Sequence, residues 1–287
     1  MWPRVSSFLR RLFADFPSAL GTTIMLVFLL LAVFGPLLAP YPYDLPIYEH
    51  PRQAPDATHW FGTDHLARDV FSRVLVGARS VLLLAGGGTL VAVALGTLVG
   101  LVSGYAGGWL DELLMRFFDS LLALPALLLA LLLLGTLRAT YGEDVSAVGK
   151  GLGVFLVLAV VYTPIVARVV RSVVLAVKTR SYVEAARLQG ESLGWILFRE
   201  ILPAALPALA VEAALRFSYA IFLTSSLGYL GVGVQPPNPD WGLMVNEGRR
   251  NVSQVPWAMW FPAAAISVVV VGANLMAEGL KRALREE

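Results

Sequence analysis

Long unbroken runs of apolar residues, separated by polar connections, dominate the pattern of this chain. Six such runs occur, at about residues 19–39, 81–101, 121–137, 152–174, 205–227 and 257–275. A helix needs about 20 predominantly apolar residues to cross the hydrocarbon core of a membrane. The runs lack the strict alternation of apolar and polar residues that transmembrane strands require. The pattern therefore predicts an all-α integral membrane protein with six transmembrane helices.

The connections between the runs differ in length and in helical character. Residues 40–79 form a polar segment whose prolines exclude a long helix before a helical stretch near 64–77. A short amphipathic helix is predicted at 107–120, between the second and third runs. Another long connection, at about 176–206, separates the fourth and fifth runs. The polar and charged residues of the chain are thus concentrated outside the apolar runs.

Lysine and arginine indicate which side of the membrane each connection occupies, because they are enriched in cytoplasmic connections. With the N-terminus inside, thirteen of them lie on the cytoplasmic side and eight on the other side. Arg4, Arg10 and Arg11 precede the first run, which ends without a small-x-small cleavage site and is read as an uncleaved span. Both termini are therefore predicted to be cytoplasmic and residues 40–79 extracytoplasmic.

Composition supports the membrane assignment and excludes several other classes. Hydrophobic residues make up 57% of the 287 residues and charged residues 15%, against about 25% charged in soluble domains. The formal net charge of +2 does not indicate a nucleic-acid partner. Cysteine is absent, and His50, His59 and His65 lack the spacing of a helical zinc pair. No metal site is expected.

Two features inside the runs each allow a structural and a functional interpretation. Residues no larger than alanine recur every four positions in the second run, at Gly88, Ala92, Gly96, Gly100 and Gly104. They predict a close helix contact, either within this subunit or with another. In the fifth run, Glu212 and Arg216 can pair on one helix face. This pair is either a structural ion pair or a substrate contact, and the sequence leaves both open.

The connection at 176–206 is predicted to be a helix, a bend and a second helix on the cytoplasmic face. Ser181 is expected to cap a short helix that continues to Gln189. Gly190 is expected to end it in a left-handed conformation. Pro203 stands where the next membrane helix begins. From the residues alone, a solvated amphipathic loop is the competing interpretation.

Several segments resemble, in order along the chain, those of one known family. Glu184-Ala185-Ala186, Gly190 and Ile201-Leu202-Pro203 resemble the EAA loop of ATP-binding-cassette importer permeases. Gly62-Thr63-Asp64 through Arg73 is similar to a segment of the second permease of dipeptide and oligopeptide importers, with Ala67 where glycine is usual. The chain also resembles further blocks of that permease at residues 104–125, 227–242 and 274–280.

The resemblance implies a type I importer permease fold with an extra N-terminal helix. Residues 1–79 would hold the cytoplasmic N-terminus, the first span and the extracytoplasmic segment, and residues 80–287 the permease domain with five spans. The loop would couple to ATPase subunits through Tyr182, Val183, Glu184, Ala185, Ala186, Arg187 and Gly190. An outer gate or a contact with a solute-binding protein would involve Asp64, Arg68, Asp69, Gln235, Trp241, Arg249 and Arg250.

The resemblance also implies a set of partners in a bacterial or archaeal cytoplasmic membrane and its lipid. They are a second, different permease subunit, two ATPase subunits that bind ATP and Mg, and an extracytoplasmic solute-binding protein. The chain has no G-x-x-x-x-G-K-[ST] sequence, so we expect neither enzyme activity nor a cofactor of its own. Short peptides are the expected cargo, with nickel or an oligosaccharide as the alternative. A secondary transporter is less favoured, because neither an inverted repeat nor an unpaired intramembrane carboxylate is evident.

Overall fold

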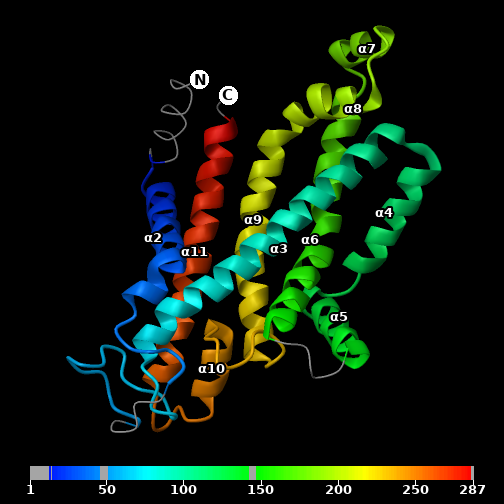
Figure 1. Cartoon of the computed structure of the whole chain (residues 1–287). Helices are drawn as coiled ribbons and strands as arrows, with labels where there is room; N and C mark the ends of the chain where they lie inside the picture. Colours follow the sequence, from blue (N-terminus) through cyan, green and yellow to red (C-terminus); the bar gives the residue numbers. More distant parts are fainter. Residues whose placement is uncertain (1–12, 14, 46–50, 142–146, 286–287) are drawn as a thin grey trace.

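The computed structural model describes residues 13, 15–45, 51–141 and 147–285, and these ranges are helical with connecting loops (Figure 1). Arg4, Arg10, Arg11 and His50 lie outside the described residues. Within the described ranges, β-structure is limited to a bridge between Thr63 and Asp69. The helices are α2 (Phe16–Leu38), α3 (Val70–Ala106), α4 (Gly108–Leu122), α5 (Ala126–Tyr141), α6 (Ala147–Val177), α7 (Ser181–Leu188), α8 (Leu193–Trp195), the π-helical turn η1 (Ile196–Ile201), α9 (Leu202–Tyr229), α10 (Trp241–Arg249) and α11 (Trp257–Arg285).

The predicted spans correspond to these helices, with one difference in the third. Five helical stretches of the described chain are long and apolar enough to cross a membrane: α2, α3, α6, the continuous stretch α8–η1–α9, and α11. The amphipathic helix predicted at 107–120 is α4, and the third run forms α5. The two helices meet at an angle of 94° and make a sixth span only if taken together. The break falls at Pro125, which has no N–H to continue a helix. The all-helical membrane fold is therefore confirmed.

The helical stretch predicted near residues 64–77 is helical only from Val70 onward, and it is continuous with the second span, because α3 begins at Val70 and continues without interruption to Ala106. Asp69 caps its start, where the carboxylate accepts a hydrogen bond from the backbone N–H of Ser72 at 2.7 Å. Gly77 does not end the helix but packs against the ring of Trp241, which a Cβ atom would approach to 2.9 Å. The proposed boundary between residues 79 and 80 thus lies inside α3.

The small residues of α3 lie against α6 in the same chain. A Cβ atom on Gly88, Gly96 or Gly104 would come within 3.0 Å of Leu158, Val166 or Val174, respectively. At Gly100 it would come within 2.6 Å of the carbonyl oxygen of Ala167. Only hydrogen fits at these positions, so the two backbones approach closely along four turns.

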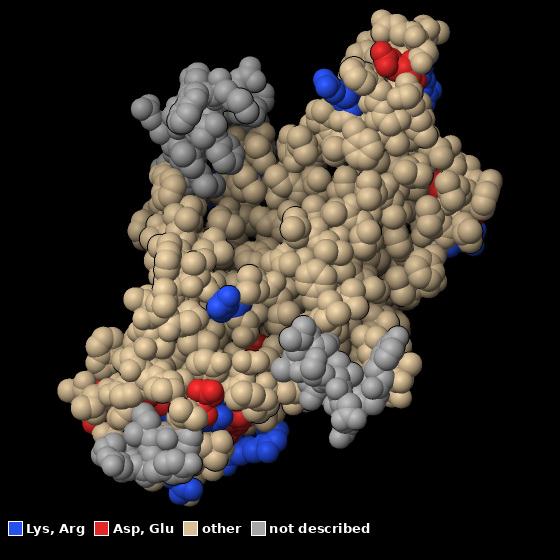
Figure 2. Space-filling model, in the orientation of Figure 1, with Lys and Arg blue, Asp and Glu red and all other residues tan. Residues whose placement is uncertain are grey.

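The remaining helices place two distinct ends on the molecule. The N-terminal helix α2 runs beside α11, and a Cβ atom on Gly21 would lie 2.5 Å from Leu275 Cβ. The α2 start, the α11 end and α7 lie at one end, and α10 lies at the opposite end (Figure 1). On the face in Figure 2, charged side chains gather mainly toward these two ends, with mostly uncharged surface between them. This distribution suits a protein that spans a bilayer.

Candidate functional site

The short helix α7 lies outside the helix bundle, at the end of the molecule that α6 and α9 share (Figure 1). Arg180, and not Ser181, occupies the N-cap position, because its carbonyl oxygen accepts bonds from Val183 N and Glu184 N at 3.0 and 3.1 Å. Ser181 is the first helical residue and makes no capping bond. The predicted cap is therefore wrong by one residue.

Gly190 ends α7 in the left-handed conformation predicted for it, with φ of +77°. The N–H of Gly190 bonds Arg187 O at 3.0 Å, and the N–H of Glu191 bonds Ala186 O at 3.1 Å. This pair of bonds is the Schellman motif, which satisfies the last carbonyl groups of a helix. The bend after α7 therefore has a defined geometry.

The two faces of α7 have different surroundings. Val183 and Ala186 are buried with Ile196, Leu197 and Ile201. Tyr182, Glu184, Ala185 and Arg187 are exposed. The resemblance places Val183 and Ala186 among the residues that couple to a partner subunit, whereas the structure turns both inward, because they share the face that packs on η1. Any contact of α7 with a partner subunit would therefore involve Ala185 and its exposed neighbours.

Polar contacts attach this region to α3 and α4. The Arg187 guanidinium lies 4.6 Å from the Tyr105 ring centre, and its Nε donates to the Tyr105 hydroxyl at 2.9 Å. Lys178 Nζ donates to Gly104 O at 2.8 Å, at the end of α3. Arg171 of α6 binds both oxygens of Asp111 of α4 at 2.5 Å. The Arg187 contact therefore ties α7 to α3, and the Arg171 contact ties α6 to α4.

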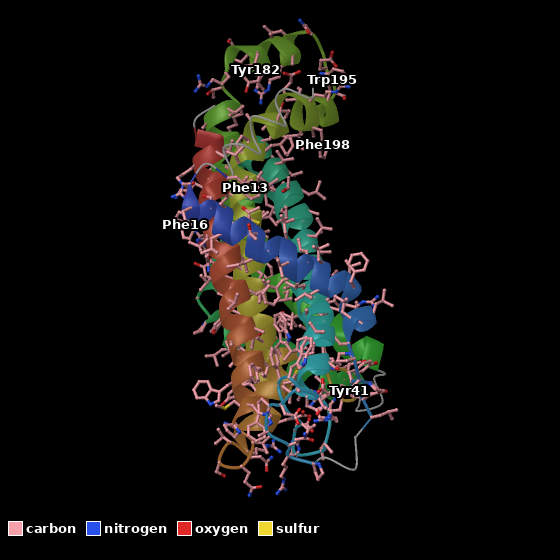
Figure 3. All side chains as sticks on the ribbon, turned by 90° about the vertical axis from the view of Figure 1, so that its left-hand side faces the viewer. Phe13, Phe16, Tyr41, Tyr182, Trp195 and Phe198 are labelled. Carbon is pink, nitrogen blue, oxygen red and sulfur yellow. The ribbon has the colours of Figure 1, made fainter. Side chains whose placement is uncertain are left out.

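An exposed apolar surface adjoins α7. It comprises the side chains of Tyr182, Leu188, Leu193, Trp195 and Phe198, which are 44, 90, 55, 41 and 49% exposed. The labelled members Tyr182, Trp195 and Phe198 lie together at the α7 end (Figure 3). Exposed apolar patches of this kind mark interaction surfaces.

The opposite end contains a buried cluster of four charges. Asp64 Oδ2 accepts bonds from Arg68 Nε at 2.7 Å and from Arg73 Nη1 at 2.6 Å. Glu247 Oε2, on α10, accepts bonds from Arg68 Nη2 at 2.7 Å and from Arg73 Nη1 at 3.1 Å. The two arginines and two carboxylates balance in charge and join the loop before α3 to α10.

The other outer residues divide into buried braces and exposed cations. Asp69 is buried and binds His59 Nδ1 at 2.9 Å. Trp241 is fully buried and donates to Val74 O at 2.9 Å. Gln235 donates to the carbonyl oxygens of Gly231 and Gly233, both at 3.0 Å. Arg249 and Arg250 are exposed, and Arg249 reaches the Tyr229 hydroxyl at 2.8 Å. Among these predicted contact residues, Arg249 and Arg250 are the exposed ones.

Some residues of the outer end were missed from the sequence. Glu247 contacts arginines 174 and 179 positions away, and the sequence carries no signal for that contact. Arg73 stands in the segment that carries the resemblance, but its burial was not evident. Asp240 caps α10 at Leu243 N, and complete burial raises its pKa to about 6. Among the described residues, no group of three or more His, Asp or Glu side chains could hold a metal ion.

Comparison with known proteins identifies the family of the chain. Residues 92–286 match the model of a family described as binding-protein-dependent transport system inner membrane component. The chain belongs to this family. Residues 5–55 match the N-terminal transmembrane domain of oligopeptide transport permease C, and this match includes α2. The expected permease fold with an extra N-terminal helix is confirmed.

Individual relatives carry related names. The chain is 38% identical over 264 residues to the dipeptide transport system permease protein DppC of Alkalihalophilus pseudofirmus, covering 92% of this chain and 84% of the relative. It is 35% identical to the glutathione transport system permease protein GsiD of Pectobacterium atrosepticum, covering 96% and 89%. Its identity to GsiD of an Escherichia coli strain is 37%, with 96% and 88% covered. The chain is thus a permease subunit, and a secondary transporter is not favoured.

Proposed function

We propose that this permease carries short peptides into the cell as one subunit of an ATP-driven importer. Relatives that share at least 35% of its residues are named for dipeptide and glutathione transport, which supports peptides over nickel or oligosaccharides. The chain contains no phosphate-binding G-x-x-x-x-G-K-[ST] sequence. Two separate ATPase subunits would therefore bind ATP and Mg and supply the energy.

The proposal assigns each end of the molecule to one side of the cytoplasmic membrane. The α7 end, which also holds the α2 start and the α11 end, would face the cytoplasm, because the lysine and arginine excess is predicted on that side. The α10 end would face outward, where Arg249 and Arg250 would receive the solute-binding protein. A second permease subunit, different from this one, would complete the pathway across the membrane of a bacterium or archaeon.

The two-faced α7 helix is the observation that carries the mechanism. Its outer face offers Tyr182, Glu184 and the small Ala185 to the ATPase subunits. Its inner face packs on η1, which continues directly into α9. Because the buried contacts and the Gly190 turn hold α7 in one orientation, movement of an ATPase subunit would displace α9 without being lost in a flexible loop.

A tryptophan at Ala185 tests this role. Ala185 is exposed and touches no buried cluster, so Ala185→Trp should fold normally but block seating of the ATPase subunits by steric overlap. We expect the ATPase subunits to be lost on copurification, together with ATP-driven dipeptide uptake into membrane vesicles. Ala57→Trp, at an exposed alanine of the opposite end, is the matched control and should retain the ATPase subunits.

The same vesicles test the cargo and the energy source. Dipeptide uptake should require ATP and the solute-binding protein and should persist when the proton gradient is collapsed. Uptake of nickel or an oligosaccharide in place of dipeptides would contradict the proposed cargo. Normal uptake by Ala185→Trp at matched expression would contradict the role of α7.

A further inference from the structure

Two opposite charges lie in the middle of the membrane helix α9. Glu212 is ten residues after the start of α9 at Leu202, and Arg216 is thirteen residues before its end at Tyr229. At a rise of about 1.5 Å per residue, they lie roughly 15 and 20 Å from those ends. Both are therefore at the depth of the hydrocarbon core, where charged side chains are costly and usually functional.

The pair is close but incompletely satisfied. Arg216 Nε and Glu212 Oε1 are 2.8 Å apart. Neither atom has a hydrogen-bond partner among the described residues, because their contact is not aligned for one. The Arg216 guanidinium also lies 4.8 Å from the centre of the Tyr219 ring and 5.9 Å from that of Tyr162 on α6. A purely structural buried pair is stable only when further hydrogen bonds complete it, and the described part of the chain supplies none to Arg216 Nε or Glu212 Oε1.

The pair borders the side of α9 that this chain leaves uncovered. Ala220 and Ile221 are fully buried, and Ser218 donates to Val270 O of α11 at 3.4 Å. On the other side, Tyr219 and Phe222 are 49 and 61% exposed. The Arg216 and Glu212 side chains keep 15 and 12% of their surface exposed. The charges are thus accessible from this uncovered side.

Lipid does not suit this side of α9. The guanidinium has five N–H donors, and its buried Nε finds no aligned acceptor among the described residues. Hydrocarbon would leave those donors unsatisfied at a cost of several kcal/mol each. A water-lined passage would satisfy them, as would a solute that carries its own charges.

We propose that this side of α9 lines the solute pathway and that Glu212 and Arg216 form a two-pole site for a zwitterionic peptide. Arg216 would receive the terminal carboxylate and Glu212 the terminal ammonium group. The two residues neutralise each other when the site is empty and neutralise the peptide termini when it is occupied, so the pathway stays neutral in both states. The assignment of a peptide as ligand rests on the proposed function.

Single cysteines test whether the site is open to water, since the chain has none of its own. Arg216→Cys and Tyr219→Cys are compared in the assembled transporter, the latter leaving the ion pair intact. Small charged methanethiosulfonate reagents should modify both, as read from the mass of this chain, and a transported dipeptide should slow the reaction. Ala220→Cys, which is buried, and Leu30→Cys, on the exposed side near the middle of α2, should stay unmodified. Failure of Tyr219→Cys and Arg216→Cys to react in every nucleotide state would show the face to be sealed by lipid or the second permease and would overturn the proposal.

Charge substitutions test the two-pole assignment. Arg216→Gln should lower dipeptide uptake by at least tenfold. The double variant Glu212→Gln/Arg216→Gln should stay equally low, because a neutral site offers no poles to the peptide. A structural ion pair predicts the opposite, because removing both charges relieves the unpaired carboxylate that the single variant creates. Recovery of uptake in the double variant would therefore refute the two-pole site. If the parent protein carries another solute and not dipeptides, the proposed cargo fails, while the cysteine experiment still decides whether α9 lines the pathway.

Discussion

The buried charge cluster at the outer end yields a quantitative prediction for Glu247→Gln. The substitution keeps the shape of the side chain but leaves the two arginines with Asp64 as their only carboxylate. Arg73 is 2% exposed and Arg68 is 6% exposed, so the excess positive charge is poorly solvated. Removing one partner of a buried ion pair costs about 3–5 kcal/mol. Because Glu247 itself is 18% exposed and glutamine still accepts a hydrogen bond, we expect a smaller loss than this range, about 2–3 kcal/mol.

Thermal unfolding of the purified protein in detergent measures this loss. One kcal/mol corresponds to roughly 2–4 °C for a chain of this size class, so the apparent Tm should fall by about 4–12 °C. Glu112→Gln is the matched control, because Glu112 pairs with Arg116 at 2.6 Å but the two side chains are 63 and 76% exposed. Exposed i,i+4 pairs contribute about 0.3–0.5 kcal/mol, so the control should shift by no more than about 2 °C. Equal shifts in the two variants would refute the claim that burial makes the cluster important.

Three further predictions concern stability. Burial raises the pKa of Asp240 in the folded protein to about 6, above the ordinary value of 3.8. Protonation of Asp240 therefore stabilises the fold fully below pH 4, and this stabilisation is lost as the pH rises through 6. The Tm of Asp240→Asn should not show this decrease between pH 4 and 6. Ala67 has φ of +59°, so Ala67→Gly should raise stability by about 1 kcal/mol, and an unchanged Tm would contradict backbone strain there. Gly96→Ala should destabilise the protein by about 1–3 kcal/mol, because its Cβ atom would lie 2.6 Å from Val166 Cβ. Gly86→Ala, whose Cβ atom would lie 3.5 Å from the Phe217 ring, should be tolerated. Equal unfolding temperatures for the two variants would show that α3 and α6 can separate at no cost.

The resemblance seen in the sequence located both ends of the molecule, but its residues have unequal roles in the structure. Asp64, Arg68, Asp69 and Trp241 were grouped with Arg249 and Arg250 as candidates for a gate or a contact. The first four are buried and brace the outer end. The two arginines remain exposed. Residue type alone does not separate these cases, because an arginine serves equally in a buried cluster and on a docking surface.

The sequence by itself determined the class of the protein, the number and order of the apolar segments, and the local turns. A run of about 20 apolar residues has few stable places outside a membrane, and Gly190 adopts a backbone conformation that favours glycine. These are local properties, so neighbouring residues suffice to predict them. The helical period likewise identified Gly88, Gly96, Gly100 and Gly104 as one face.

The tertiary structure alone decided what each face meets. It set the small residues of α3 against α6, turned Ala186 inward and Ala185 outward, and brought Glu247 to two arginines more than 170 positions away. It also joined the predicted outer helix to the second span, because Gly77 accommodates Trp241 instead of ending the helix. Periodicity groups residues on a face but contains no information about the neighbour of that face. That neighbour is chosen by long-range packing and charge compensation across the whole fold.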